Sequence, residues 1–187
     1  MGLIDRLFGN TRTSEEEPSE TIPQYDWNDV DARSEAIHQH YEDIPESQAQ
    51  EIAEILCRKL TEGNYSMRGI ADEVTEHTGL DEDRVFTIIG SESAAMSNLR
   101  RVQSYSSRAD SQEYVYQWMG PDDHRTTDIC AGIKRDIESQ GGAVPLTMLQ
   151  SLIEEHASQH ENGTPERASE FLPHREYRHA LTRHVDF

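Results

Sequence analysis

Apolar residues recur at the spacing of an amphipathic helix along most of the chain, and this pattern predicts a mainly α-helical fold. The expected helices span residues 31–41, 47–61, 66–79, 81–107, 127–139 and 145–160. Their ends carry typical signals: Ser66 is expected to cap the third helix, while Gly63 and Gly79 follow the last turns of the second and third. Cys57 lies on the apolar stripe of the second helix, so we expect it in the core.

The longest predicted helix, 81–107, carries two polar residues along its buried part. Its apolar stripe consists of Val85, Ile88, Ile89, Ala95, Met96, Leu99, Val102 and Tyr105. Glu92 and Asn98 are six residues apart, which separates them by about 240° around the helix axis. This separation favours structural roles over a shared catalytic role. We expect Glu92 to pair with an arginine and Asn98 to hydrogen-bond backbone near a strand.

After Ser111 the period changes from helical to alternating, and Tyr114, Tyr116 and Trp118 indicate a strand. Gly120-Pro121 then predicts a turn. We therefore expect a mainly α fold with a small β element (an α+β class), in which a helical domain is followed by a small C-terminal α/β lobe. The expected organisation is an N-terminal tip and linker over 1–30, a helical region over 31–112, and the C-terminal lobe over 113–187 with a loop at 162–165.

The first nine residues place Leu3, Ile4, Leu7 and Phe8 at helical spacing, and a polar stretch over 11–20 follows them. A short apolar tip on a polar tether is typical of a peptide that docks on a partner protein. In the alternative interpretation, the tip packs on its own domain. The apolar run is too short for a signal peptide or a membrane span, so we expect assembly in a reducing cytoplasm and no membrane partner.

The charge balance indicates the salt conditions in which the protein works and the partners it can bind. The chain has 36 acidic and 17 basic residues, a net charge of −19, and Lys59 and Lys134 are its only lysines. Many carboxylates with few lysines are typical of proteins that work in molar salt, where the Debye length falls to roughly 3 Å and screens the repulsion. An ordinary acidic mesophilic protein is the alternative. The same charge argues against nucleic acid as a specific partner, and Arg100-Arg101 is the one cationic doublet in the central region.

Three residues form a candidate metal site. Cys130, His174 and His179 are accepted zinc ligands, and the His-x4-His spacing falls in the range that structural sites use. Candidates for a fourth ligand are Asp123, His124 and His184. In the alternative interpretation, the two histidines bond to carboxylates and Cys130 packs on an apolar helix face. No disulfide framework is expected from two cysteines.

Two stretches of the chain together resemble one known family. Leu60, Gly63 and Ser66 form a turn motif, and Ser91-Glu92 with Asn98 form a second motif on the long predicted helix. The other stretch runs from Tyr114 to Gly132 and contains Trp118, Asp123, Arg125, Thr126 and Cys130. With the closing segment 173–179, these motifs resemble the Mu F-like head-morphogenesis family, the minor capsid proteins of tailed phages. The resemblance covers roughly residues 45–180.

The sequence departs from the family at its cysteines. The family's paired cysteines are reduced to Cys130; Thr127 stands at the first position, and Tyr177 and His179 stand in the closing pair. The resemblance implies a virion protein that is assembled in the host cytoplasm and associates in several copies with the portal protein and other head proteins. It implies no enzymatic activity and no cofactor beyond the candidate zinc. A head-to-tail connector ring protein and a zinc-dependent hydrolase of a halophile are the alternatives.

Overall fold

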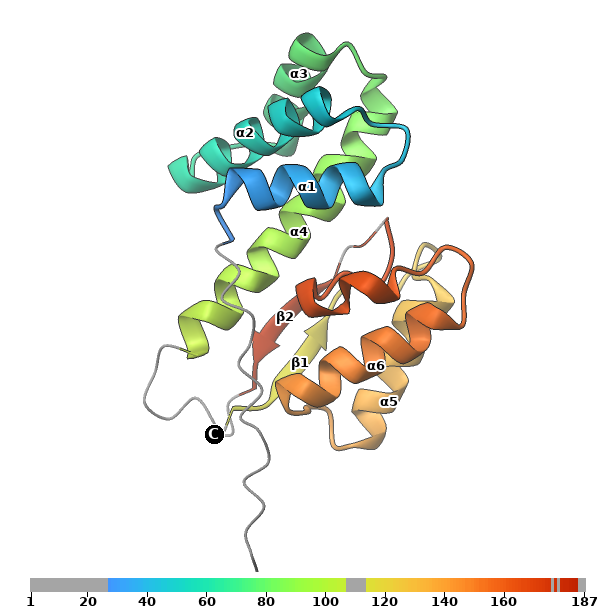
Figure 1. The fold of residues 1–187 in the computed structure, drawn as a ribbon. Helices are drawn as coiled ribbons and strands as arrows, with labels where there is room; N and C mark the ends of the chain where they lie inside the picture. Colours follow the sequence, from blue (N-terminus) through green and yellow to red (C-terminus); the bar gives the residue numbers. More distant parts are fainter. Residues whose placement is uncertain (1–26, 107–113, 176, 178, 185–187) are drawn as a thin grey trace, which may run out of the picture.

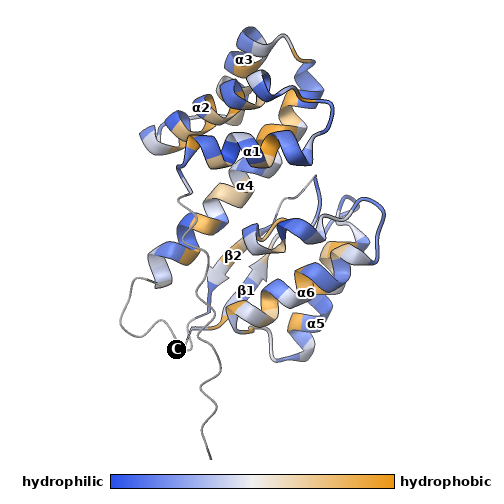
Figure 2. Ribbon diagram, viewed as in Figure 1, coloured by the Kyte–Doolittle hydropathy of each residue, from blue (hydrophilic) through white to orange (hydrophobic). Residues whose placement is uncertain are grey.

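Four helices build the first lobe of the molecule (Figure 1). They are α1 (Val30–His40), α2 (Glu46–Glu62), α3 (Met67–Thr78) and α4 (Glu82–Ser106). The structure is a computed structural model that describes residues 27–106, 114–175, 177 and 179–184. Apolar side chains of these helices form one buried cluster, to which α2 contributes seven residues. The hydrophobic stripes of Figure 2 face one another across this cluster.

The helix ends agree with the capping residues in the sequence. Ser66 accepts a hydrogen bond from the Gly69 backbone N–H at 3.0 Å, and Thr127 does the same for Cys130 at 3.3 Å. Gly79 ends α3 with a φ of 70°, a left-handed conformation that glycine adopts without a steric penalty. These local signals fix where the helices begin and end before any tertiary contact is made.

The second lobe places two helices and a short 3-10 helix around a two-stranded sheet. Its elements are β1 (Tyr116–Met119), α5 (Asp128–Ser139), α6 (Leu146–Ser158), η2 (Pro165–Glu170) and β2 (Ala180–Arg183). The strands are antiparallel, and Trp118 pairs with Leu181 in the register. Both residues are buried in the lobe's own apolar cluster. The sheet therefore ties the C-terminal segment to the chain that follows α4.

Helix α4 belongs to both lobes, because its 25 residues run from one core into the other. Val85, Ile88 and Ile89 are buried in the first cluster, while Leu99 and Val102 are buried in the second. A helix that is buried from both sides has little solvated face at its centre. Polar residues of its central part, Glu92 and Asn98 among them, are accordingly buried as well.

The predicted fold class is confirmed: the structure is mainly helical with a small antiparallel sheet. Each helix expected from the sequence is present, with bounds within two residues of those predicted. The loop expected at 162–165 is present, although its last residue, Pro165, already begins η2. The sequence did not indicate strand β2 in the C-terminal segment. The apolar tip (Leu3, Ile4, Leu7, Phe8) and the proposed division at residue 112 lie outside the described residues, so both stay predictions.

None of the helices in the described part of the chain is long and apolar enough to cross a membrane.

Candidate functional site

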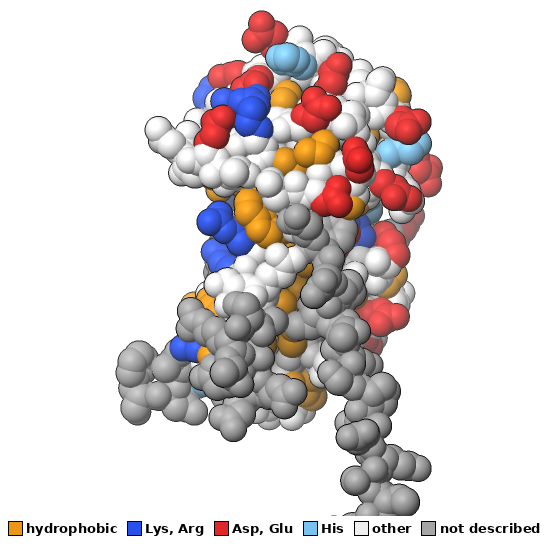
Figure 3. Space-filling view, turned by 60° about the vertical axis from the view of Figure 1, so that its left-hand side comes forward, with side chains coloured by type: hydrophobic (Ala, Val, Ile, Leu, Met, Phe, Trp, Pro, Cys, Tyr) orange, Lys and Arg blue, Asp and Glu red, His pale blue; other side chains and the backbone are white. Residues whose placement is uncertain are grey.

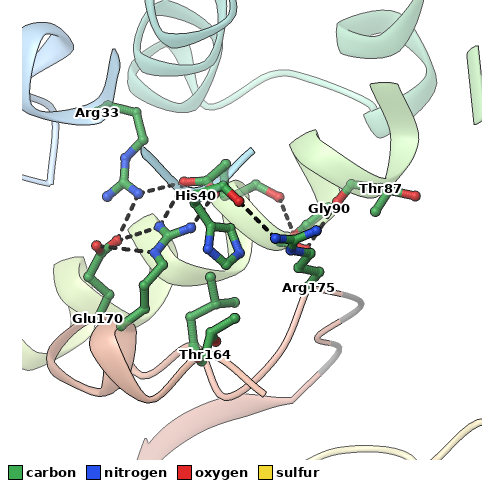
Figure 4. Close-up of polar contacts among 12 residues, drawn as sticks. Arg33, His40, Thr87, Gly90, Thr164, Glu170 and Arg175 are labelled. Atoms are coloured by element: carbon green, nitrogen blue, oxygen red, sulfur yellow. Dashed lines mark hydrogen bonds and ion pairs between the residues drawn. The ribbon is translucent and has the colours of Figure 1, made fainter. Parts of the chain in front are cut away.

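Two arginines and two glutamates meet where the lobes join, and we call them the ionic cluster (Figure 4). The cluster consists of Arg33 from α1, Glu92 from α4, and Arg167 and Glu170 from η2. Nη1 of Arg33 lies 2.6 Å from Oε2 of Glu92 and 2.8 Å from Oε2 of Glu170. Arg167 binds Glu92 through both terminal nitrogens, at 2.5 and 2.9 Å. These ion pairs thus join α1, α4 and η2, which are distant in sequence.

The geometry of η2 brings its charges to the helices of the first lobe. Thr164 anchors the start of η2 by donating its hydroxyl to the Leu172 carbonyl at 2.6 Å. Phe171 ends it with a φ of 58°, a left-handed conformation that is uncommon for a large residue. The fully buried Phe171 side chain packs in the core and holds this turn in place. As a result Arg167 and Glu170 face α1 and α4 instead of solvent.

Electrostatics keep every member of the ionic cluster charged. Burial alone raises the pKa of Glu92, but the charges and hydrogen bonds of Arg167 and Arg33 outweigh burial and lower that pKa to about 2. Burial also raises the pKa of Glu170, and the same two arginines lower it below its usual range. With both pKa values low, these carboxylates remain ionised at neutral pH. A group that donates or accepts protons at neutral pH needs a pKa near 7. The low pKa values of these carboxylates therefore favour a structural role, in which the ionic cluster holds the lobes together.

A shallow hollow of about 170 Å³ lies beside the ionic cluster, lined by Ala36, Gln39, His40, Glu166, Arg167 and Glu170. His40 is only 6% exposed, and its Nδ1 lies 3.5 Å from Oε1 of the exposed Glu166. Arg175 donates to the His40 carbonyl at 3.0 Å (Figure 4). Burial, followed by the charge of Arg167, lowers the pKa of His40 to about 4. The histidine is therefore neutral at physiological pH.

His40 should make the fold sensitive to mild acid. The group titrates at about 4 in the folded protein against 6.5 in the reference state, so it stabilises the fold fully above pH 6.5. That contribution, about 3 kcal/mol for this shift, should be lost as the pH falls from 6.5 towards 4. Urea unfolding of the wild type and of His40→Gln between pH 7.5 and 4 measures the difference. The exposed His77→Gln is the control and should retain the wild-type dependence; a His40→Gln profile parallel to the wild type would refute this role.

A second group of side chains surrounds Cys130 at the start of α5. The Cys130 Sγ lies 3.1 Å from Nε2 of His174, and the Thr127 hydroxyl lies 3.1 Å from the same nitrogen. Both Cys130 and His174 are nearly inaccessible, at 1% and 3% exposure. Cys130 also packs beside Ile129 and Ile133 in the apolar cluster of the second lobe, as expected for a core thiol.

The structure brings together two of the three predicted zinc ligands. Whereas Cys130 and His174 are in contact, the His179 ring stacks on Trp118 and Tyr177, with ring centroids 5.8 and 5.9 Å apart. Within the part of the chain that the structure describes, no group of three or more His, Cys, Asp or Glu residues is arranged to hold a metal ion. Zinc binding stays a prediction, and the observed contacts close this part of the lobe through hydrogen bonds and ring packing.

The expectation for Asn98 is confirmed, and so is the one for Glu92. The Asn98 Oδ1 accepts a hydrogen bond from the Leu181 backbone N–H of β2 at 3.0 Å, and its Nδ2 donates to the Tyr177 hydroxyl at 3.3 Å. Glu92 pairs with two arginines instead of one. The sequence interpretation did not identify Arg33, Arg167 or Glu170, because a charged residue in a short helix or a polar loop ordinarily indicates a solvated face.

Comparison with known proteins gives no relative: no family model, no curated protein and no solved structure matches the chain.

Proposed function

We propose that this chain is a minor head-morphogenesis protein of a tailed virus of a halophilic host. It acts as a structural component of the head, in several copies, and binds the portal protein and other head proteins. It is assembled in the host cytoplasm, is carried in the virion and has no catalytic activity. The proposal rests on the resemblance of residues 45–180 to the Mu F-like family.

One observation supports this proposal: several residues of the resemblance make structural contacts in the fold. Glu92 is the centre of the ionic cluster, and Asn98 joins α4 to β2. The Trp118 and Tyr177 rings pack at a tilt with centroids 5.3 Å apart, and Cys130 contacts His174. The contacts that these residues make are structural, which supports a structural role for the protein.

The halophilic assignment predicts a fold that depends on salt. The chain carries a net charge of −19, and both of its lysines already pair with carboxylates, Lys59 with Glu73 and Lys134 with Asp122. Repulsion among the remaining carboxylates is screened in molar salt and acts over roughly 10 Å at 0.1 M. The melting temperature should therefore fall by many degrees between these two conditions in differential scanning fluorimetry. An equal melting temperature would contradict the halophilic assignment.

The apolar tip supplies the test of the portal association. Leu3, Ile4, Leu7 and Phe8 can each contribute ~1.5–3 kcal/mol when buried on a partner, and ordering the tether offsets part of that gain. A deletion of residues 1–9 should leave the melting temperature of the isolated protein unchanged and reduce incorporation into virus particles. Incorporation is measured by complementing a virus that lacks the gene and quantifying the protein in purified heads.

A matched pair of variants separates the apolar side chains from chain length. Replacing Leu3, Ile4, Leu7 and Phe8 by serine should reproduce the deletion, whereas replacing Asp5, Arg6 and Asn10 by serine should not. A large drop in melting temperature with normal incorporation would show that the tip packs on its own domain.

A further inference from the structure

One stretch of this acidic chain contains no carboxylate. Residues 93–109 carry no Asp or Glu although the whole chain has 36, and they include Arg100 and Arg101. Most of this stretch forms the C-terminal half of α4, which lies beside β2 with its Arg183. Figure 3 looks onto this side of the molecule and shows blue side chains below an upper lobe that carries many red ones. We call Arg100, Arg101 and Arg183 the arginine face.

Aromatic rings and backbone hold the three guanidinium groups in place. The Arg100 guanidinium lies 5.0 Å from the centroid of the Trp27 ring, and that of Arg183 lies 4.5 Å from the Tyr114 ring. Arg101 donates to the Leu181 carbonyl at 3.4 Å. A hollow of about 300 Å³ opens on this face, lined by Ser97, Arg100, Arg101, Ser104 and Tyr105. Side chains that are already fixed in one conformation lose little entropy when a ligand binds. The arginine face is therefore preorganised for binding.

The described part of this acidic chain supplies no carboxylate partner to the arginine face. Within the described residues, none of the three arginines forms an ion pair with a carboxylate. Arg33, Arg58, Arg68, Arg84 and Arg167 each have at least one such partner. A guanidinium has five donors in a planar fork that matches a carboxylate, and the hydrogen bond from Arg101 to the Leu181 carbonyl uses only one of them. The ligand chemistry that completes this face is therefore anionic.

We propose that the arginine face is a docking surface for an acidic segment of a partner protein. The Arg100 and Arg183 guanidiniums already cover faces of the Trp27 and Tyr114 rings, which leaves those faces unsuited to stacking nucleic-acid bases. Two arginines that line a small hollow, with a third on the neighbouring strand, fit a few carboxylate side chains better than the long phosphate track of a nucleic acid. Paired contacts between guanidinium and carboxylate also survive in molar salt better than long-range attraction does. The proposal does not rest on the virion assignment.

The test uses the full-length protein and a fluorescein-labelled peptide in which Glu alternates with Ser. Fluorescence anisotropy measures its binding at the lowest salt concentration that leaves the circular dichroism spectrum unchanged. The variant R100Q/R101Q/R183Q should bind about tenfold more weakly than the wild type, as expected for three partly exposed pairs. The control R68Q/R125Q/R135Q removes the same charge from exposed arginines elsewhere and should bind like the wild type. R100Q/R183Q keeps the Arg101 bond to β2 and should already weaken binding.

Four other outcomes of this experiment would each overturn the proposal. Equal weakening by both triple variants would show that only net charge matters. Binding of a peptide with Gln in place of Glu, as tightly as the acidic one, would remove the role of carboxylates. Tighter binding of a thymidine oligonucleotide, lost in the arginine-face variant alone, would assign the surface to nucleic acid. Absence of peptide binding by the folded wild type would leave the arginine face without this function.

Discussion

Replacing Glu92 by alanine should lower the free energy of unfolding by about 3–5 kcal/mol. The side chain is fully buried and accepts hydrogen bonds from both Arg33 and Arg167, which are themselves buried. Removing it leaves two positive charges in the interior with Glu170 as their one remaining carboxylate in the cluster. Urea unfolding at constant molar salt, followed by circular dichroism, measures the change, and proteolysis between the lobes should accelerate with it.

The matched control is Glu73→Ala, because Glu73 also pairs with two basic residues, Arg58 and Lys59, but at the surface. That substitution should cost below ~1 kcal/mol, since exposed pairs contribute little. Exchanging Arg33, Glu92, Arg167 and Glu170 together for Met, Leu, Met and Gln should restore most of the lost stability, because no buried charge is then uncompensated. A Glu92→Ala variant as stable as Glu73→Ala would show that the ionic cluster does not hold the lobes.

Asn98→Ala should lower the free energy of unfolding by about 2–4 kcal/mol, because it leaves two buried polar groups without their partner at ~1–3 kcal/mol each. These groups are the Leu181 backbone N–H and the Tyr177 hydroxyl. The loss should be concentrated where α4 meets β2, so hydrogen exchange of the Leu181 amide should accelerate more than that of amides in α2. Both urea unfolding and hydrogen exchange are needed to locate the effect.

Ser97→Ala is the control, as Ser97 precedes Asn98 on α4 and is only partly buried. Its effect should stay within ~0.5 kcal/mol, as for surface substitutions in general. If Asn98→Ala destabilised the fold no more than Ser97→Ala, or if the Leu181 amide kept its protection, the link between α4 and β2 would have to lie elsewhere.

The helices of this protein follow from local sequence. The apolar stripe of α2, the Ser66 cap and the glycine after α3 act within a few residues of one another, and they place the helices correctly. The structural roles of Glu92 and Asn98 followed from a similar argument, since a polar side chain in a buried helix needs a partner. The kind of partner could be predicted in both cases.

The identity of the partners of Glu92 and Asn98 could not be predicted from the sequence. Arg33 and Arg167 lie 59 and 75 residues from Glu92, and η2 turns inward only because Phe171 is buried in a core that forms from the whole second lobe. Strand β2 has four residues and exists through its pairing with β1. The pairing of β2 with β1 also places Arg183 near Arg100. The Arg100-Arg101 doublet in the sequence therefore indicated only part of the arginine face. Each of these features depends on contacts between segments that are distant in the chain.

The proposed function is tested most directly by quantitative mass spectrometry of purified virus particles and procapsids from the virus that encodes this chain. We expect the protein to copurify with heads through a density gradient, in a fixed ratio of several copies to each portal ring. Particles assembled with the deletion of residues 1–9 should contain less of it. A protein that is absent from both mature particles and procapsids, and remains in the soluble fraction of infected cells, would contradict the assignment as a head protein.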